Sequence, residues 1–307
     1  MGTIWFYLYL FSNRTIEFSV LIMRVKDYRS IFITSLLPVY DALEAESFFY
    51  LILEHKLKMR RIDLALQPET YLAEAQMVEW NILLKELLEE VPIQYLLGTT
   101  SFYGLDFEVD ANVLIPRPET EELVDWILSD YKKQSIEDYK ILDIGTGSGC
   151  IAIALAKNIS EAEITAIDVS AKALAIAQKN ALANDVAVTF LRENILETQD
   201  LHRQFDIIVS NPPYVRILEK DEIKNNVLEH EPHLALFVDD HDALLFYRKI
   251  AALAQKNLKE DGKLYFEINQ YLGLEMIDLL TSMGFVGVEL RKDIYGNDRM
   301  ICGRKAN

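Results

Sequence analysis

The chain has 307 residues, half of them hydrophobic, which is enough for one large domain and a second, smaller one, each with its own core. Its 31 basic and 48 acidic residues give a formal net charge of −17, which repels nucleic acid unless basic residues are locally concentrated. We therefore expect no direct nucleic-acid partner, and a basic protein partner fits the charge more easily. Cys150 and Cys302 belong to no CxxC or Cys/His cluster, so we expect two reduced core thiols in a cytoplasmic protein and no metal site.

The first 22 residues include an apolar, aromatic run at residues 4–11 that is too short to cross a bilayer. A secretory signal would need a basic start and a cleavage site of small residues, whereas Asn13, Arg14 and Glu17 follow this run. We therefore expect no membrane association. Because the sequence from Met23 is typical of a natural start, we predict that residues 1–22 are a translated upstream extension outside the working fold.

Residues 27–91 place apolar side chains at i, i+3 and i+4 and contain almost no glycine, which predicts helices throughout. The clearest helices are residues 44–57 and 73–88, and the second carries an apolar stripe that includes Trp80. We predict a small helical domain at residues 23–95 with its aromatic side chains in the core. A separate helical domain beside a catalytic one is expected to help recognise a substrate.

Residues 101–115 alternate apolar and polar side chains around Gly104, which predicts a β-hairpin within a linker at residues 96–118. The hairpin leads into residues 116–122, where two prolines stiffen the chain and acidic residues suit the first turn of a helix. A helix start explains most of this stretch. It does not explain Arg117 between the two prolines, so a role for Arg117 in a cleft stays open.

From Lys140 onward, predicted strands and helices alternate, which is typical of a mainly parallel sheet with helices on both faces. We therefore predict an α/β catalytic domain at residues 119–307. The last two strands flank the turn-like residues 295–298 and predict a hairpin, which would place one antiparallel C-terminal strand in the sheet. The predicted strands are residues 140–144, 163–168, 187–191, 205–210, 263–268, 286–290 and 299–302, and the predicted helices start near residue 150 or cover residues 171–183, 242–258 and 272–283.

A glycine-rich loop follows the first of these strands, in which Gly145, Gly147 and Gly149 alternate with Thr146 and Ser148. Glycines let the backbone turn tightly and approach a ligand closely, and the helix start behind the loop offers unpaired N–H groups. Such a loop alone is a weak signal, because dinucleotide enzymes carry similar ones. It predicts a binding site for a nucleotide-like cofactor at the carboxyl ends of the strands.

Two carboxylates narrow the choice of cofactor. Asp168 ends the second strand about 20 residues after the loop, where a carboxylate can accept hydrogen bonds from both hydroxyls of a ribose. Asp143 stands just before the loop and suits a ligand with a free ammonium group rather than a pyrophosphate. Together they point to S-adenosylmethionine. Asn194 could contact its adenine, with Ile195 packing on the ring, or the two could be a loop asparagine and a core isoleucine; both interpretations fit.

The sharpest signal is the sequence Asn211-Pro212-Pro213-Tyr214, directly after the apolar strand at residues 205–210. A planar NH₂ group offers two donors, and the Asn211 side-chain oxygen and the Pro212 carbonyl could accept both while Tyr214 packs on its flat face. Such a clamp would aim the nitrogen at the methyl group of the cofactor, and orientation of this kind can lower a barrier by about 7 to 11 kcal/mol. No strong base is needed, so we assign no catalytic role to His230, His233 or His241.

Taken together, these motifs resemble the PrmC/HemK family, the protein-glutamine N5-methyltransferases that modify peptide chain release factors. The resemblance runs from about Met23 to the C-terminus. It implies a Rossmann-like class I S-adenosylmethionine-dependent methyltransferase, a monomer, that methylates the glutamine in the Gly-Gly-Gln loop of release factors and grips the factor with its helical domain. The matching stretches are residues 92–95 with Gly98, 102–104, 114–121, 143–149, 211–214, 231–232, 235–236, 247–248, Asp293 and 296–299.

The chain departs from the family pattern in two places. It has Val238, Asp239, Asp240 and Ala243 where the family often has glycines, and Asn194 where the family usually has an acid. An N6-adenine or other nucleic-acid methyltransferase remains the alternative, because Asn-Pro-Pro-Tyr can bind any planar NH₂ group. That enzyme would need a basic groove or a target-recognition domain for a flipped base, and the net charge of −17 argues against both. A catalytically silent partner protein is a third reading.

Overall fold

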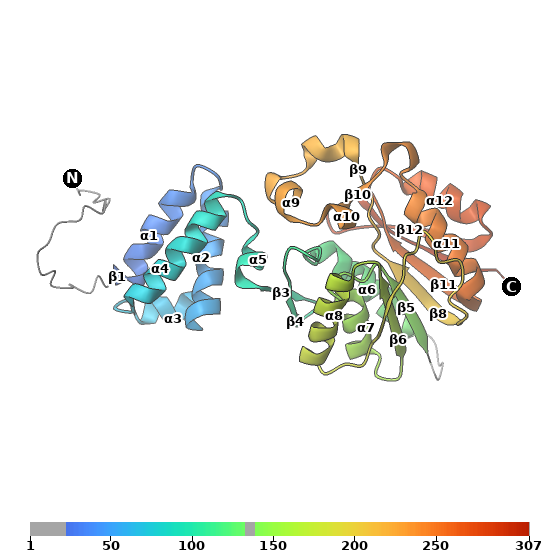
Figure 1. The fold of residues 1–307 in the computed structure, drawn as a ribbon, viewed down its shortest axis with the longest axis horizontal. Helices are drawn as coiled ribbons and strands as arrows, with labels where there is room; N and C mark the ends of the chain where they lie inside the picture. The colour runs from blue at the N-terminus through green and yellow to red at the C-terminus, as the bar shows by residue number, and fades with distance from the viewer. Residues whose placement is uncertain (1–22, 133–138, 307) are drawn as a thin grey trace, which may run out of the picture. The chain divides into compact units, whose positions relative to one another are not determined.

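The computed structural model describes residues 23–132 and 139–306, so the prediction about residues 1–22 lies outside the described residues. The described chain forms two compact units, one up to Glu89 and the other from Glu90 (Figure 1). Within these ranges no helix is long and apolar enough to cross a membrane.

The first unit is helical, as predicted. Its helices are α1 (Val25–Leu36), α2 (Ala42–Leu57), α3 (Arg61–Leu66) and α4 (Glu74–Leu88), and the two-residue strands β1 (Met23–Arg24) and β2 (Tyr71–Leu72) pair antiparallel. Helix α2 begins where it does because the Asp41 carboxylate accepts hydrogen bonds from two free N–H groups of the first turn. The core is aromatic: the ring of Trp80 lies 5.6 Å from that of Phe49 and 5.7 Å from that of Tyr28, both edge to face.

The second unit is built on a seven-stranded sheet in the order β12-β13-β11-β8-β5-β6-β7. Strand β13 is antiparallel to both of its neighbours and the other pairs are parallel, which confirms the predicted mixed sheet with one antiparallel strand. The strands are β5 (Lys140–Ile144), β6 (Glu163–Asp168), β7 (Thr189–Arg192), β8 (Phe205–Ser210), β11 (Leu258–Glu267), β12 (Phe285–Lys292) and β13 (Asp298–Lys305).

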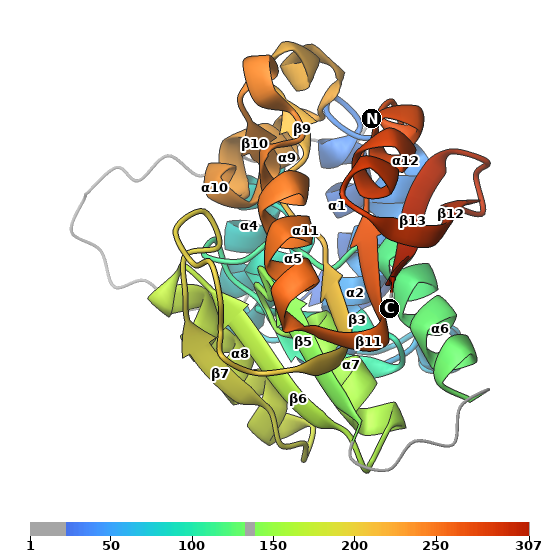
Figure 2. The ribbon, with the colours of Figure 1, turned by 90° about the vertical axis from the view of Figure 1, so that its right-hand side faces the viewer.

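Helices cover both faces of this sheet (Figure 2). Helices α6 (Pro118–Tyr131), α7 (Cys150–Asn158) and α8 (Ala171–Ala183) pack on one face, and α11 (Leu245–Asn257) and α12 (Gly273–Ser282) pack on the other. Because successive side chains of a strand point to opposite faces, Ile141 joins the core under α6 and α7 while Leu142 joins the core under α11. This is why the buried strands are apolar without alternation.

The predicted hairpin is present as β3 (Thr99–Phe102) and β4 (Leu105–Glu108). Its two-residue turn places Tyr103 and Gly104 at φ of 51° and 74°, as the twist of a tight hairpin requires. Phe102 and Phe107 are buried in the same core as α6, so the hairpin belongs to the second unit. The short helix α5 (Ile93–Leu97) precedes it and was not predicted, because five residues are too few to show a helical period.

The chain between β8 and α11 is a run of short elements that the sequence did not predict. They are β9 (Val215–Arg216), η1 (Ile217–Glu222), α9 (Asn225–His230), α10 (His233–Leu236), β10 (Phe237–Val238) and η2 (Asp240–Asp242). Strands β9 and β10 pair in parallel and hold the two ends of this run together. As a result, the residues after Asn211 return to the carboxyl edge of the sheet.

Candidate active site

A cavity of about 410 Å³ opens at the carboxyl ends of the four neighbouring strands β8, β5, β6 and β7. Parallel α/β sheets bind their ligands at this edge. Most of the predicted site residues line the cavity: Gly145, Thr146, Gly147, Ser148, Asp168, Asn194, Ile195, Asn211, Pro212 and Pro213. Asp143, Gly149 and Tyr214 do not line it.

The three loop glycines all have left-handed backbones, with φ of 74° at Gly145, 55° at Gly147 and 84° at Gly149. A Cβ at Gly145 or Gly147 would meet no atom within 4 Å, so these two positions face open space that a ligand can enter. A Cβ at Gly149 would lie 2.9 Å from Ile153 Cδ1 and 3.1 Å from Ala177 Cβ. Gly149 therefore lets α7 and α8 pack closely, while the other two leave room beside the backbone.

Asp168 organises this loop as well as facing the cavity. One carboxylate oxygen accepts the N–H of Gly147 at 2.9 Å, and the other accepts the N–H of Ser170 at 2.8 Å. Burial raises the pKa of Asp168, and these backbone donors oppose that rise. The N–H groups of Gly145 and Thr146 donate to the carbonyl of Ile167, and that of Gly149 donates to the carbonyl of Thr146, so four of the loop N–H groups are already used within the protein. The loop therefore suits a ligand without phosphates.

Asp143 lies at the end of β5 and is fully buried beneath the loop. Its carboxylate accepts a hydrogen bond of 2.6 Å from the hydroxyl of Thr146. Burial, with a smaller contribution from the nearby charge of Asp168, raises the pKa of Asp143 to about 7, although the hydrogen bond from Thr146 opposes the rise. The contact we predicted between Asp143 and an ammonium group stays a prediction; the geometry here gives Asp143 a role in holding the loop.

The loop after β7 contributes Glu193, Asn194, Ile195 and Leu196 to the cavity. The Asn194 side-chain oxygen accepts the N–H of Leu196 at 3.1 Å, which leaves its NH₂ group as a donor. Glu193 was not singled out from the sequence. It supplies a carboxylate one residue before Asn194, close to the position where the family usually has an acid.

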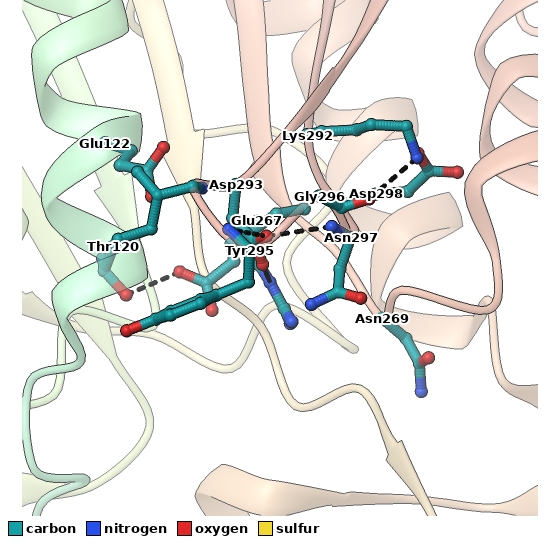
Figure 3. A network of polar contacts seen from close by, with 12 residues as sticks. Thr120, Glu122, Glu267, Asn269, Lys292, Asp293, Tyr295, Gly296, Asn297 and Asp298 are labelled. Carbon is teal, nitrogen blue, oxygen red and sulfur yellow. Dashed lines mark hydrogen bonds and ion pairs between the residues drawn. The ribbon is translucent and has the colours of Figure 1, made fainter.

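Asn211 lines the cavity one residue beyond β8, and its side-chain nitrogen lies 3.4 Å from the hydroxyl oxygen of Thr120. Thr120, on α6, donates a 2.6 Å hydrogen bond to Glu267, at the end of β11 (Figure 3). The hydroxyl of Tyr214 donates to the other oxygen of Glu267 at 3.0 Å. The ring of Tyr214 is therefore anchored at its far end on a carboxylate.

Glu267 is 1% exposed, and burial raises its pKa, whereas the hydrogen bonds from Thr120 and Tyr214 and the charge of Arg299 oppose that rise. Burial also raises the pKa of Tyr214 above its ordinary value. The sequence reading missed both Thr120 and Glu267. A signal existed for Glu267, because it ends a predicted strand on the same sheet edge as Asp168.

Arg117 lines the cavity, as the open alternative for this residue allowed. Its guanidinium lies 2.6 Å from a carboxylate oxygen of Glu231, which is 3% exposed. The other oxygen of Glu231 accepts the N–H of Ile115 at 3.2 Å. The pair joins the chain before α6 to the start of α10, and Pro232, Leu234 and Ala235 there also line the cavity.

These features fit S-adenosylmethionine. Gly145 and Gly147 would let a nucleoside approach the backbone, Asp168 retains acceptor capacity for ribose hydroxyls, and Ile195 offers an apolar surface to a base. Among residues 23–132 and 139–306, no group of three or more His, Cys, Asp or Glu side chains is placed to hold a metal ion. Cys150 lines the cavity, and burial raises the pKa of its thiol to about 12.

Comparison with known proteins identifies the fold and the family of the chain. A family described as "PrmC N-terminal domain" matches residues 40–98, and one described as "Methyltransferase small domain" matches residues 124–234. A solved structure of the hMettl16 catalytic domain in complex with MAT2A 3'UTR hairpin 6 aligns with a TM-score of 0.50 and 16% identity, over 66% of this chain and 76% of that one. This likeness shows the methyltransferase fold.

Two curated relatives decide the family. The release factor glutamine methyltransferase of Flavobacterium psychrophilum is 59% identical over 280 residues, which cover 91% of this chain and 98% of that protein. The release factor glutamine methyltransferase of Bacteroides thetaiotaomicron is 43% identical over 272 residues, which cover 88% of this chain and 96% of that protein. These relatives confirm the resemblance that the Asn211 motif in the lining of the cavity indicates: the chain belongs to the PrmC/HemK family of release factor glutamine methyltransferases.

Proposed function

We propose that this S-adenosylmethionine-dependent protein-glutamine N-methyltransferase methylates the side-chain amide nitrogen, N5, of the glutamine in the Gly-Gly-Gln loop of peptide chain release factors. The observation that carries the proposal is the position of Asn211. Its side chain lines a cavity of cofactor size, with its nitrogen 3.4 Å from the hydroxyl oxygen of Thr120. A planar amide that reaches a cofactor in this cavity can therefore meet the Asn211 side chain.

The proposed mechanism is one of orientation. S-adenosylmethionine, when bound, supplies an electrophilic methyl group on a sulfonium. The Asn211 side-chain oxygen and the Pro212 carbonyl accept the two amide hydrogens of the glutamine and so fix the plane of its amide. In that geometry the lone pair on nitrogen points into the cavity, and the acceptors increase the electron density on nitrogen as its resonance with the carbonyl is lost. The excess proton leaves to water, so no residue needs to act as a strong base.

Asp168, the loop at residues 145–149, Asn194 and Ile195 are proposed to hold the cofactor. Asp168 binds the ribose hydroxyls, and Asn194 and Ile195 bind the adenine. The helical unit is proposed to help hold the release factor, which the match of residues 40–98 to the PrmC N-terminal domain supports. We further propose a cytoplasmic monomer; size-exclusion chromatography with light scattering tests the second of these points.

Methylation of an adenine amino group is the alternative, because the same clamp would accept it. The formal charge of −17 opposes a nucleic-acid substrate, which proteins hold mainly through basic contacts to phosphates. A protein substrate is therefore favoured. A silent binding protein would bind the cofactor without transferring the methyl group.

The test incubates the full chain with labelled S-adenosylmethionine and, separately, a release factor, the same factor with its loop glutamine changed to alanine, DNA and RNA. Label on the intact factor alone supports the proposal. Label on nucleic acid, or cofactor binding without transfer to any of the four, contradicts it.

A site variant tests the clamp. We expect Asn211→Ala to lower the rate of transfer at least a hundredfold, because one of the two acceptors is lost, with the Kd for S-adenosylmethionine changed by no more than a few-fold. The matched control is Asn158→Ala, which removes an exposed asparagine at the end of α7 whose side chain donates to the Ala154 carbonyl. This control should transfer methyl groups at the wild-type rate. An Asn211→Ala enzyme with wild-type turnover would contradict the clamp.

A further inference from the structure

We propose that Glu267 and Thr120 are positioning residues that fix which face of the Asn211 amide points at the substrate. This inference rests on the proposed function. Thr120 lines the cavity together with Asn211, and both positioning residues are proposed to act through Asn211. The side chains come from α6, from β11 and from the turn after β8, and Figure 3 shows Thr120 directed at Glu267.

The first step concerns the direction of the hydrogen bonds at Glu267. An ionised carboxylate only accepts hydrogen bonds, and its two oxygens receive the Thr120 hydroxyl at 2.6 Å and the Tyr214 hydroxyl at 3.0 Å. A 2.6 Å separation is typical of a hydroxyl that donates to a charged oxygen. Burial raises the pKa of Glu267, and the hydrogen bonds from the two hydroxyl groups and the charge of Arg299 oppose that rise and favour its charged form. The single proton of Thr120 is therefore committed to Glu267.

The second step concerns Asn211. Since Thr120 has one proton and donates it to Glu267, its oxygen can only accept from Asn211. The Asn211 atom that lies 3.4 Å from this oxygen must then be the NH₂ nitrogen. The amide oxygen of Asn211 in that place would face a lone pair of the Thr120 oxygen and form no hydrogen bond. The side-chain oxygen of Asn211 is left to face away from Thr120. It is in this orientation that Asn211 can accept a hydrogen from a substrate amide.

The third step explains a motif that the reaction itself does not use, the stretch from Asp293 to Arg299. Asp293 accepts the N–H groups of Tyr295 and Asn297 at 3.0 and 2.9 Å and so shapes the turn between β12 and β13 (Figure 3). The other oxygen of Asp293 accepts the guanidinium of Arg299 at 3.1 Å. The turn thus holds a cation beside the buried Glu267 and compensates its charge.

The test measures methyl transfer to the release factor and cofactor binding for Thr120→Val, Thr120→Ser and the control Thr165→Val. Valine keeps the size of threonine but removes the hydroxyl, so Asn211 loses the acceptor that orients it. We expect Thr120→Val to lower kcat/KM for the factor about 10- to 100-fold, with the Kd for S-adenosylmethionine within twofold of wild type. Thr120→Ser restores the hydroxyl and should stay within threefold of wild type.

Thr165 is the matched control because its hydroxyl is equally buried but has no hydrogen-bond partner within the described ranges. Thr165→Val should leave kcat/KM unchanged. Because the wild-type enzyme is assayed beside the variants, a wild type without transfer refutes the proposed function, whereas full transfer by both wild type and Thr120→Val refutes only the positioning role. A serine variant as impaired as the valine variant also refutes it.

Glu267→Gln provides a second variant of nearly unchanged size, in case Thr120→Val does not fold. A glutamine offers one acceptor and one donor in place of two acceptors, so Thr120 and Tyr214 can no longer both donate to it. We expect at least a tenfold loss of kcat/KM with the cofactor Kd within threefold of wild type. Wild-type kcat/KM in this variant overturns the inference.

Discussion

Gly149 provides a prediction whose magnitude follows from the structure. Replacing Gly149 with alanine adds a Cβ at a residue with φ of 84°, a conformation that costs an L-residue about 1–2 kcal/mol. The same Cβ would lie 2.9 Å from Ile153 Cδ1 and 3.1 Å from Ala177 Cβ, well inside the ordinary separation of about 3.5–4.0 Å. Both neighbours are buried in helices, and forcing a methyl group into such a core costs about 1–3 kcal/mol more.

The expected loss is therefore about 2–5 kcal/mol in the free energy of unfolding. Gly104→Ala is the matched control, because Gly104 has a similar φ of 74° but a Cβ there would meet no atom within 4 Å. It should lose only about 1–2 kcal/mol. The difference between the two variants isolates the packing of α7 against α8.

Urea unfolding followed by circular dichroism measures both variants, with the slope against urea compared to exclude a change in the unfolded state. If Gly149→Ala loses no more stability than Gly104→Ala, the close approach of the two helices is not what requires glycine, and this reasoning fails. A smaller loss in Gly104→Ala than in Gly149→Ala supports it.

Two further predictions concern carboxylates. Asp168→Asn replaces one of the two carboxylate oxygens that accept backbone N–H groups with an NH₂ donor, so the glycine-rich loop should shift. We expect the Kd for S-adenosylmethionine, measured by calorimetry, to rise about 10- to 100-fold. An unchanged Kd would contradict this prediction. Because burial raises the pKa of Asp143 from 3.8 to about 7, the stability it contributes in its protonated form is complete below about pH 4 and is lost as the pH rises through 7. Between pH 5 and pH 8, the free energy of unfolding of the wild type should therefore fall by about 3 kcal/mol relative to that of Asp143→Asn. If urea unfolding shows the same pH dependence for both proteins, Asp143 is not a buried, protonated group.

Local patterns were enough to predict the elements of the sheet but not their order. The strand at residues 140–144 could be recognised from its apolar run, because a strand that is buried on both faces needs apolar side chains at successive positions. That β5 lies between β8 and β6 depends on contacts between residues about 20 to 70 positions apart, which no local period records. The short elements at residues 215–242 were missed for a related reason. They are fixed by individual bonds, such as that of Arg216 to Glu219 in η1, rather than by a repeating apolar face.

The site was predictable where its residues follow strands in the sequence. Asp168 and Asn211 each stand at a strand end and line the cavity. Asp143 shows the limit of this reasoning: it is the last residue but one of β5 rather than part of the loop, and it is completely buried. Thr120 could not be connected to Glu267, because 147 residues separate them and only the folded sheet brings α6 beside the end of β11.

The position of β13 has a consequence for how the second unit is made. This strand lies between β12 and β11, yet it follows both in the chain, so during synthesis β12 has no partner and β11 presents an open edge until β13 emerges from the ribosome. Open edges of this kind pair with other chains. Nascent or truncated chains that end before Asp298 are therefore expected to need chaperones, and they would also lack Arg299. The sheet and the surroundings of Glu267 become complete in the same late event.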